Sequence, residues 1–326
     1  MKKVNKLHYK KGGFPFDTYK CDFAASIQYL FEQQSLFAIQ NLQKINERAG
    51  SVSQSLCLSG GGALNCPANS LIWREAQYRN VFVPPTSDDG GLALGAAWYL
   101  LHTVMRRPRR VQLSDCSSAA YLGHQVLEQE VKEAIALERQ HLVVTVPIDP
   151  PEQAGEDIAA DKVIAWFNGR SEVGPRALGN RSILANPSQS HNWKRVNKIK
   201  NREEWRPFAP AILEEEAPSW FSGAPLPSPF MLFTATVKRP AEIPAVTHVD
   251  GSARVQTVSK KGSPFRRVLE SMQRHSGIPV VLNTSLNGPG EPIVNRPIEA
   301  INLFLSSDLD VLYLLGHRIN KKKSFG

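Results

Sequence analysis

The stretch LCLSGGGALN, residues 56–65, places three glycines directly between a short apolar run and a helical pattern. A strand that ends in a glycine turn and continues into a helix is typical of an α/β unit. Glycine lets the backbone approach a ligand closely, and the N–H groups at a helix start attract anions. The spacing matches neither GxGxxG nor a P-loop. The stretch therefore predicts either a tight strand-to-helix turn or a nucleotide-binding loop.

The same alternation of helices and strands extends on both sides of this stretch. Residues 22–48 repeat apolar side chains at helical spacing, which predicts a helix with a buried stripe. Downstream, a second helical pattern leads to the apolar run at residues 81–83, and a third helix follows to about Met105. The order helix, strand, loop, helix, strand, loop, helix indicates an α/β fold.

Two acidic residues, Asp88 and Asp89, follow the second predicted strand and precede two glycines. The carboxyl end of a strand is where ligands bind in α/β sheets. A carboxylate at this position can ligate a metal, serve as a general base or cap the helix that follows. The residues alone leave these three roles open.

A basic linker at residues 106–110 separates this region from a second part of the chain, which again mixes strands and helices. We expect strands at 163–167, 231–237, 279–282 and 311–315, and helices at 127–136, 192–198, 265–275 and 298–305. The proline-rich stretch 219–230 is only partly loop-like and is a candidate for a segment that covers a site.

Composition agrees with two folded domains and points to an anionic ligand. The chain has 326 residues, of which 42% are hydrophobic and 21% charged, so wholesale disorder is excluded. The formal net charge of +9 lies partly in Lys-rich ends. Residues 170–206, however, hold nine Lys or Arg against three Glu inside a folded region. Such a local excess indicates an anion-binding surface.

Within and beyond this basic region, two tripeptides form a candidate phosphate site. Lys200 and Arg202 are spaced by two, and Ser285 and Asn287 follow the strand predicted at 279–282. In an extended segment, Lys200 and Arg202 would project to the same side and clamp one phosphate group. The Ser and Asn side chains would add hydrogen bonds around an oxyanion or a ribose.

Three further arginines and one histidine have two possible roles each. Arg176, Arg181 and Arg254 stand among small and apolar residues, so each is either paired with a carboxylate or available to an anionic ligand. His248 near Asp250 could form a catalytic pair, although a structural histidine is the commoner case. The sequence has neither GxSxG nor HExxH, which leaves no support for a serine hydrolase or a zinc protease.

The four cysteines have no CxxC spacing, which argues against zinc and against a disulfide framework. No apolar run approaches the roughly 20 residues that cross a bilayer, and the Lys-rich start lacks the apolar segment of a secretory signal. We therefore expect a cytoplasmic protein without a membrane partner.

Six stretches together carry a resemblance to a known family: 56–69, 84–97, 172–187, 202–213, 244–258 and 279–294. They resemble the O-carbamoyltransferases of the NodU/CmcH type, which include nodulation-factor, cephamycin and tobramycin enzymes. The resemblance implies an actin-like ATPase-type domain and a YrdC-like α/β domain. It also implies that carbamoyl phosphate and ATP form carbamoyladenylate, whose carbamoyl group passes to a hydroxyl of a small acceptor, such as a sugar or an antibiotic scaffold.

The resemblance assigns roles to individual residues. It implies catalytic roles in the KxR and SxN signature, substrate contacts from arginines, a nucleotide loop and a metal-binding aspartate. The catalytic residues would be Lys200, Arg202, Ser285 and Asn287, and the substrate-binding arginines Arg176, Arg206 and Arg254, to which we add Arg181 from its own sequence context. The nucleotide loop would contain Gly60, Gly61, Gly62 and Asn65, and the metal-binding aspartate would be Asp88. The implied cofactors are Mg²⁺ with ATP, and iron or another divalent metal in the transferase site.

The members of this family carry a long N-terminal half with the histidines of the metal site, and His8 cannot replace a pair of ligands. We therefore expect only the C-terminal half of such an enzyme. Residues 1–110 would be the second half of the actin-like domain and residues 111–326 the YrdC-like domain. The transfer step would then be lost, or would need a separate N-terminal half or a homodimer.

A different class of function remains open, namely a nucleotide- or RNA-binding module without turnover. The basic charge is compatible with RNA. Only Trp193 and Trp205 interrupt the basic stretch, however, so a base-stacking platform is poorly supported and nucleic acid is disfavoured.

Overall fold

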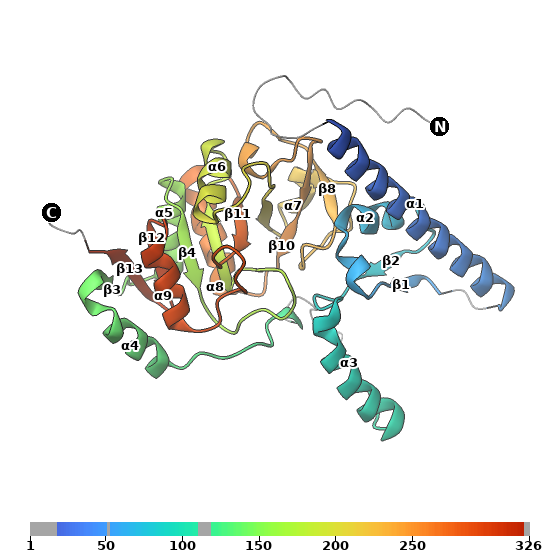
Figure 1. Ribbon diagram of the computed structural model, residues 1–326, viewed down its shortest axis with the longest axis horizontal. Helices are drawn as coiled ribbons and strands as arrows, with labels where there is room; N and C mark the ends of the chain where they lie inside the picture. Colours follow the sequence, from blue (N-terminus) through green and yellow to red (C-terminus); the bar gives the residue numbers. More distant parts are fainter. Residues whose placement is uncertain (1–17, 51–52, 110–118, 323–326) are drawn as a thin grey trace.

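The computed structural model describes residues 18–50, 53–109 and 119–322, which form a mixed α/β fold (Figure 1). Its largest sheet has eight strands in the order β10-β6-β11-β5-β4-β12-β13-β3. The strands are β3 (Leu142–Thr145), β4 (Ile164–Phe167), β5 (Arg181–Ala185), β6 (Ala209–Leu213), β10 (Gln256–Val258), β11 (Val280–Ser285), β12 (Val311–Leu314) and β13 (His317–Lys321). The pairs β10–β6 and β12–β4 are parallel and the other pairs antiparallel, so the sheet is mixed.

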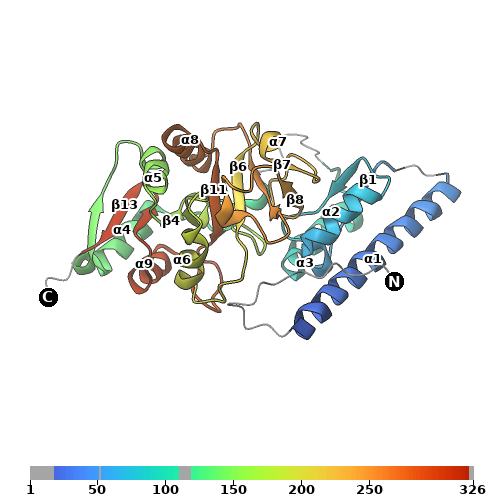
Figure 2. The ribbon, with the colours of Figure 1, turned by 90° about the horizontal axis from the view of Figure 1, so that it is seen from above.

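Helices cover both faces of this sheet, as Figure 2 shows. Helices α5 (Pro150–Ala159) and α8 (Pro264–Ser276) pack on one face with Ile164 and Trp166 of β4. On the other face lie α4 (Glu128–Leu137), α6 (His191–Ile199) and α9 (Pro297–Ser306), with Ala165 and Phe167 of the same strand. Because both faces of the sheet are covered, β4 is apolar and buried along its whole length rather than alternating.

A small three-stranded sheet stands beside the large one. It contains β7 (Phe221–Ser222), β8 (Thr234–Val237) and β9 (Ser252–Arg254), and α7 (Ala217–Trp220) directly precedes β7. One residue, Val255, separates β9 from β10 of the large sheet. The small sheet therefore brings the end of β9, with Arg254, next to the large sheet.

The N-terminal part is a smaller α/β unit. It consists of α1 (Thr18–Arg48), β1 (Ser55–Cys57), α2 (Cys66–Glu75), β2 (Asn80–Phe82) and α3 (Leu92–Trp98), which continues as a π-helical segment (Tyr99–Val104). Strands β1 and β2 pair in parallel, as the alternation of helices and strands predicts. The α/β fold class and the expected helices and strands of both parts are confirmed, with boundaries shifted by a few residues.

The expectation that α1 buries its apolar stripe is wrong. None of its residues is buried, and Phe23, Ile27 and Leu30 are 57%, 53% and 58% exposed. The half-buried face that packs near α2 carries Gln28 and Leu36 instead. Periodicity identifies an apolar face of a helix but not the element that covers it. None of the described helices combines the length and the apolar character needed to cross a membrane.

Helix α2 docks the N-terminal unit against the rest of the chain. The Asn69 side chain donates to the Leu232 carbonyl at 2.9 Å. The Ser70 hydroxyl donates to the Thr234 carbonyl at 2.9 Å and accepts from the Thr234 N–H at 2.8 Å. These bonds pair polar groups of α2 with the backbone that leads into β8, so the glycine loop before α2 is fixed relative to the small sheet.

Candidate functional site

The two tripeptides that are distant in sequence meet in the structure. The Lys200 ammonium donates to the Asn287 amide oxygen at 2.7 Å, to the Ser285 carbonyl at 2.6 Å and to the Ser285 hydroxyl at 3.2 Å. The Ser285 hydroxyl in turn donates to the Asn287 amide oxygen at 2.6 Å. Ser285 is the last residue of β11 and Lys200 caps α6, so a strand end and a helix end position the cluster.

The geometry around Lys200 differs from the extended segment that we expect from the sequence. Lys200 has helical backbone angles and Asn201 has a φ of 43°, so residues 200–202 form a tight turn. Asparagine tolerates this left-handed conformation better than most residues. The Arg202 side chain is positioned by two neighbours. Its Nε donates to Asn197 Oδ1 at 2.6 Å, and its guanidinium lies 4.5 Å from the centre of the Phe208 ring.

Sequence reasoning missed Asn197. It lies on α6 three residues before Lys200, a spacing that places two side chains on neighbouring positions of one helix face. Its amide also donates to the carbonyls of Glu204 and Arg206. Asn197 thereby fixes the turn that carries both cations, and the helical spacing was the available signal.

Lys200, Arg202, Ser285 and Asn287 line a cavity of about 550 Å³ together with Arg206 and the Gly288–Gly290 turn. The Arg206 side chain is half exposed and pairs with Glu203 at 2.7 Å. A cavity of this volume lies in the usual range for small-molecule sites. We call the set Lys200, Arg202, Arg206, Ser285 and Asn287 the basic cluster.

The electrostatics of the basic cluster favour an anion. Burial, and then the neighbouring Arg202, lower the pKa of Lys200 to about 7. Burial, and then Arg206, lower the pKa of Arg202 to about 10. Four oxygen acceptors oppose this effect at Lys200 because they favour the protonated form. An incoming phosphate would remove the unfavourable repulsion between these cations.

A second cavity, of about 300 Å³, contains Arg176 and Arg254 and is also lined by His248, Asn65 and Cys66. The Nε atoms of Arg176 and Arg254 are buried and have no hydrogen-bond partner. Burial, and then Arg176, lower the pKa of Arg254 to about 10, and Arg202 acts in the same direction. Arg254 therefore interacts electrostatically with cations of both cavities, and its buried Nε–H group lacks a partner among the described residues.

His248 and Asp250 are not directly paired. The Ser252 hydroxyl lies between them, 2.7 Å from Asp250 Oδ1 and 3.3 Å from His248 Nδ1. Burial lowers the pKa of His248, so its neutral form is favoured at physiological pH. His248, Cys66 and Gln28 line the second cavity, and sequence reasoning did not place any of them there.

Arg181 is not brought to either cavity. It is fully buried, its guanidinium donates to the carbonyls of Asn168 at 2.6 Å and Gly169 at 3.2 Å, and it lies 3.6 Å from the centre of the Phe167 ring. The Arg181 guanidinium thus stabilises the loop that contains Asn168 and Gly169. The structure thus separates Arg181 from Arg176, which stands in the same sequence stretch.

The glycine loop forms the predicted turn between β1 and α2. Gly60 has a φ of 95° and donates its N–H to the Ser87 carbonyl at 2.6 Å. The space above Gly60 and Gly61 is open, whereas Gly62 faces the ring of Phe31. Asn65 caps α2 by accepting from the Ala68 N–H at 3.1 Å, and its amide donates to Gln28 at 2.8 Å. The loop thus has a structural role and leaves two glycines accessible.

Asp88 acts as a cap in this structure. Its carboxylate accepts from the Gly90 N–H at 3.2 Å at the start of the turn before α3. Among residues 18–50, 53–109 and 119–322, no three His, Cys, Asp or Glu side chains stand close enough to hold a metal. His8 lies outside these residues. The described donor set does not fit a transition metal, which needs several protein ligands rather than a single carboxylate.

Comparison with known proteins identifies the family. The profile "Carbamoyltransferase C-terminus" matches residues 155–321, and "Carbamoyltransferase N-terminus" matches residues 3–98. The expectation that the chain holds the C-terminal half alone is therefore not supported. A full-length HypF in the phosphate- and nucleotide-bound form aligns with 53% of this chain and 22% of its own, at 16% identity and a TM-score of 0.38, which is too low to establish a shared fold.

Two relatives share much of the sequence. The nodulation protein NolNO of Sinorhizobium fredii is 36% identical over 98% of this chain and 47% of its own length. A 3'-hydroxymethylcephem-O-carbamoyltransferase of Amycolatopsis lactamdurans is 37% identical over 85% of this chain and 50% of its own length. The chain spans about half the length of these relatives. With one family profile covering half of its residues and the other most of its N-terminal part, the chain belongs to the carbamoyltransferase family.

Proposed function

We propose that the protein is an O-carbamoyltransferase that forms carbamoyladenylate in the basic cluster and passes the carbamoyl group to a hydroxyl of a small acceptor. The observation that carries this proposal is the contact of Lys200 with Ser285 and Asn287 beside Arg202. Membership in the family and a relative named as an O-carbamoyltransferase support carbamoyl transfer to a hydroxyl group.

The proposed reaction has three steps. Water cleaves carbamoyl phosphate to carbamate and phosphate. A carbamate oxygen then attacks the α-phosphorus of ATP, and pyrophosphate leaves. Finally the acceptor hydroxyl attacks the carbamoyl carbon, loses its proton, and AMP leaves. The first two steps develop negative charge on phosphate oxygens, which positioned cations stabilise.

Different residues would stabilise different parts of the phosphate charge. Lys200 is a point charge held by Ser285 and Asn287, while Arg202 offers a planar fork that is anchored by Asn197. Arg254 and Arg176 line the second cavity, where their positive charge would favour carbamoyl phosphate or the released phosphate. Mg²⁺ enters with ATP as part of the substrate.

Asp88 would contribute to a divalent metal site for the transfer step only if a partner polypeptide supplied further ligands, because it has no co-ligand among the described residues. Gly60 and Gly61 have open space above them and stand at the carboxyl end of β1. This is the position at which α/β sheets bind nucleotides. We propose that this loop receives the nucleotide part of the adenylate during transfer.

We also propose two domains, namely part of an actin-like ATPase-type domain in residues 1–110 and a YrdC-like domain in residues 111–326. The separate β1–β2 sheet and the eight-stranded sheet support this division. The exposed apolar faces of α1 and α3 support a partner, either a second polypeptide that supplies an N-terminal half or another copy of this chain.

Titration calorimetry with ATP and Mg²⁺ tests the proposed site. Arg202→Ala removes a charge-assisted phosphate contact worth about 1.5–3 kcal/mol, so we expect an affinity loss of at least about tenfold. Arg139→Ala removes an exposed arginine just before β3, the edge strand of the large sheet opposite β10, and serves as the matched control. Equal affinity in the wild type and Arg202→Ala would refute the site.

A further inference from the structure

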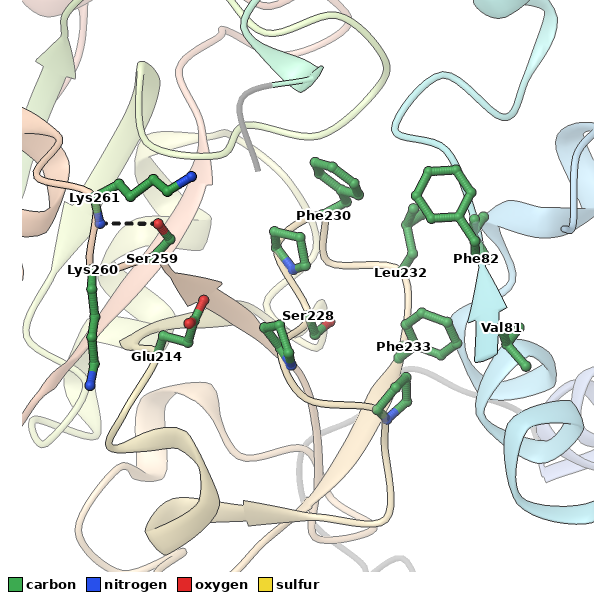
Figure 3. Close-up of a pocket in the computed structure, with 14 residues that line it drawn as sticks. Val81, Phe82, Glu214, Ser228, Phe230, Leu232, Phe233, Ser259, Lys260 and Lys261 are labelled. Carbon is green, nitrogen blue, oxygen red and sulfur yellow. Dashed lines mark hydrogen bonds between the residues drawn. The ribbon is translucent and has the colours of Figure 1, made fainter. Parts of the chain in front are cut away.

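A third cavity, of about 610 Å³, lies between β2 and the segment 225–233 (Figure 3). None of its described lining residues belongs to the two cavities of the candidate functional site. The proline-rich segment, which the sequence marked as one that covers a site, supplies one of its walls. Its volume is in the range of cavities that enclose a small organic molecule.

One side of this cavity is apolar and aromatic. Phe82 of β2, Phe230, Leu232 and Phe233 line it, together with three prolines of the segment. Phe82 is 42% exposed, and Figure 3 shows its ring beside Leu232 at this side of the cavity. Flat apolar rings at this position provide a surface on which the face of another ring can pack.

The opposite side is polar. The Glu214 carboxylate is half-buried, has no hydrogen bond or ion pair with any described residue, and points toward the cavity in Figure 3. In the same view Lys261 extends toward Phe230, whereas Lys260 runs away from the cavity. A partly desolvated carboxylate gains most from a ligand that donates hydrogen bonds, such as a hydroxyl group.

The cavity lies beside the carboxyl end of β2 in the N-terminal unit. Val83, which lines it, follows the last residue of β2, and the chain continues through two prolines to Asp88. The Ser87 carbonyl in this connection accepts the N–H of Gly60. The cavity therefore stands at the same carboxyl edge of the β1–β2 sheet as the glycine loop, where α/β proteins bind their ligands.

We propose that this cavity binds the hydroxylated acceptor, as a ring compound with one apolar face and hydroxyl groups at its edge. The apolar face packs on Phe82 and Phe230, and the edge hydroxyls donate to Glu214. The assignment to the acceptor rests on the proposed function, because only a carbamoyl transfer to oxygen requires a hydroxyl substrate.

Saturation-transfer NMR with phenyl β-D-glucoside, a probe that has an apolar ring and a hydroxylated ring, tests this proposal. We expect the wild type to bind it and both Glu214→Gln and Phe82→Ala to weaken binding at least about fivefold. Glu133→Gln and Leu137→Ala, two exposed positions on α4, are the matched controls and should bind the probe as the wild type does. Glu214→Gln keeps the side-chain shape, so it guards against a fold defect in Phe82→Ala.

The proposal would be overturned if the wild type did not bind the glucoside, or if the wild type and both cavity variants bound it equally. It would also be overturned by a result with benzoate as a second probe, namely that Glu214→Gln binds benzoate more strongly than the wild type does while its binding of the glucoside is unchanged. The last result would mark a site for apolar anions. Failure of the proposed function is a separate result, because the wild-type chain would then bind the glucoside but neither ATP nor carbamoyl phosphate.

Discussion

Lys200 is the residue whose charge state most directly governs the proposed site. It is buried and faces Ser285 and Asn287, which offer neutral oxygens rather than a carboxylate. Burial and Arg202 together lower its pKa to about 7, well below the ordinary value of a lysine. In the free protein near neutral pH, Lys200 is therefore divided between a charged and a neutral form.

This pKa makes ATP binding depend on pH in a defined direction. A bound triphosphate favours charged Lys200 and raises its pKa, so binding above about pH 7 must take up a proton. We expect ATP affinity to fall as pH rises from about 7 to about 9, by up to about tenfold per unit. Calorimetry in buffers of different ionisation enthalpy measures the proton uptake.

Lys200→Arg is the control for this titration, because a guanidinium stays charged throughout the range. We expect the part of the pH dependence that comes from residue 200 to vanish in this variant. If the two proteins show the same proton uptake, Lys200 is not the titrating group.

Sequence reasoning located the basic cluster but could not sort the arginines. Arg176 and Arg181 share one stretch of small residues, yet of the two only Arg176 lines a cavity of the candidate functional site. Arg181 begins β5 opposite Phe167 of β4, and this pairing turns its side chain inward over the Phe167 ring. Register between two strands decides the outcome, and register is a long-range property that the stretch itself does not contain.

At the scale of elements, periodicity and cap residues predicted most helices but missed several strands. Strand β6 contains Pro210, which argues against a central strand. Pro210 pairs with Leu282 of β11, but the register with β10 begins only at Ala211. The missing N–H of the proline is thus tolerated where β10 offers no partner. Short strands that are buried on both faces also lack the alternation that identifies a strand.

Gly174 connects the two parts of the chain at a close approach. Its φ is 92°, and a Cβ atom at this position would stand 2.1 Å from the carbonyl oxygen of Pro85. Gly277, the C-cap of α8, has a φ of 75° but no atom within 4 Å of such a Cβ. Both glycines thus have a positive φ that strains other residues, but only at Gly174 would a Cβ atom also collide with a neighbouring backbone atom.

Gly174→Ala should therefore be more destabilising than Gly277→Ala. We expect a loss of about 1 kcal/mol for Gly277→Ala from the backbone conformation alone, and of at least about 2 kcal/mol for Gly174→Ala because Pro85 must also move. Urea unfolding of both variants measures the difference. Equal losses would show that the contact between Gly174 and Pro85 does not hold the two parts together.

At the scale of the whole molecule, two helices leave large apolar side chains exposed. Helices α1 and α3 have no buried residue, and Figure 1 shows α3 projecting away from the rest of the chain. The exposed side chains include Phe23, Leu30, Leu92 and Trp98. Several large apolar side chains exposed on one helix indicate an interaction surface in a folded protein.

We expect the isolated chain to associate through these surfaces. Sedimentation velocity should show concentration-dependent oligomers that Phe23→Ser combined with Leu30→Ser shifts toward the monomer. Leu137→Ser, at an exposed position on α4, should leave the association of the wild type as it is. A wild-type chain that remains monomeric at every concentration would contradict this expectation.

Carbamoyl-phosphate-dependent release of pyrophosphate from ATP is the direct assay of adenylate formation by the basic cluster. With ATP, Mg²⁺ and carbamoyl phosphate, we expect the wild type to release pyrophosphate. The combined change Ser285→Ala and Asn287→Ala should suppress release, because Lys200 loses the oxygens that position it, while circular dichroism shows the fold retained. ATP binding without carbamoyl-phosphate-dependent pyrophosphate release from the wild type would contradict the proposed chemistry and favour a binding module without turnover.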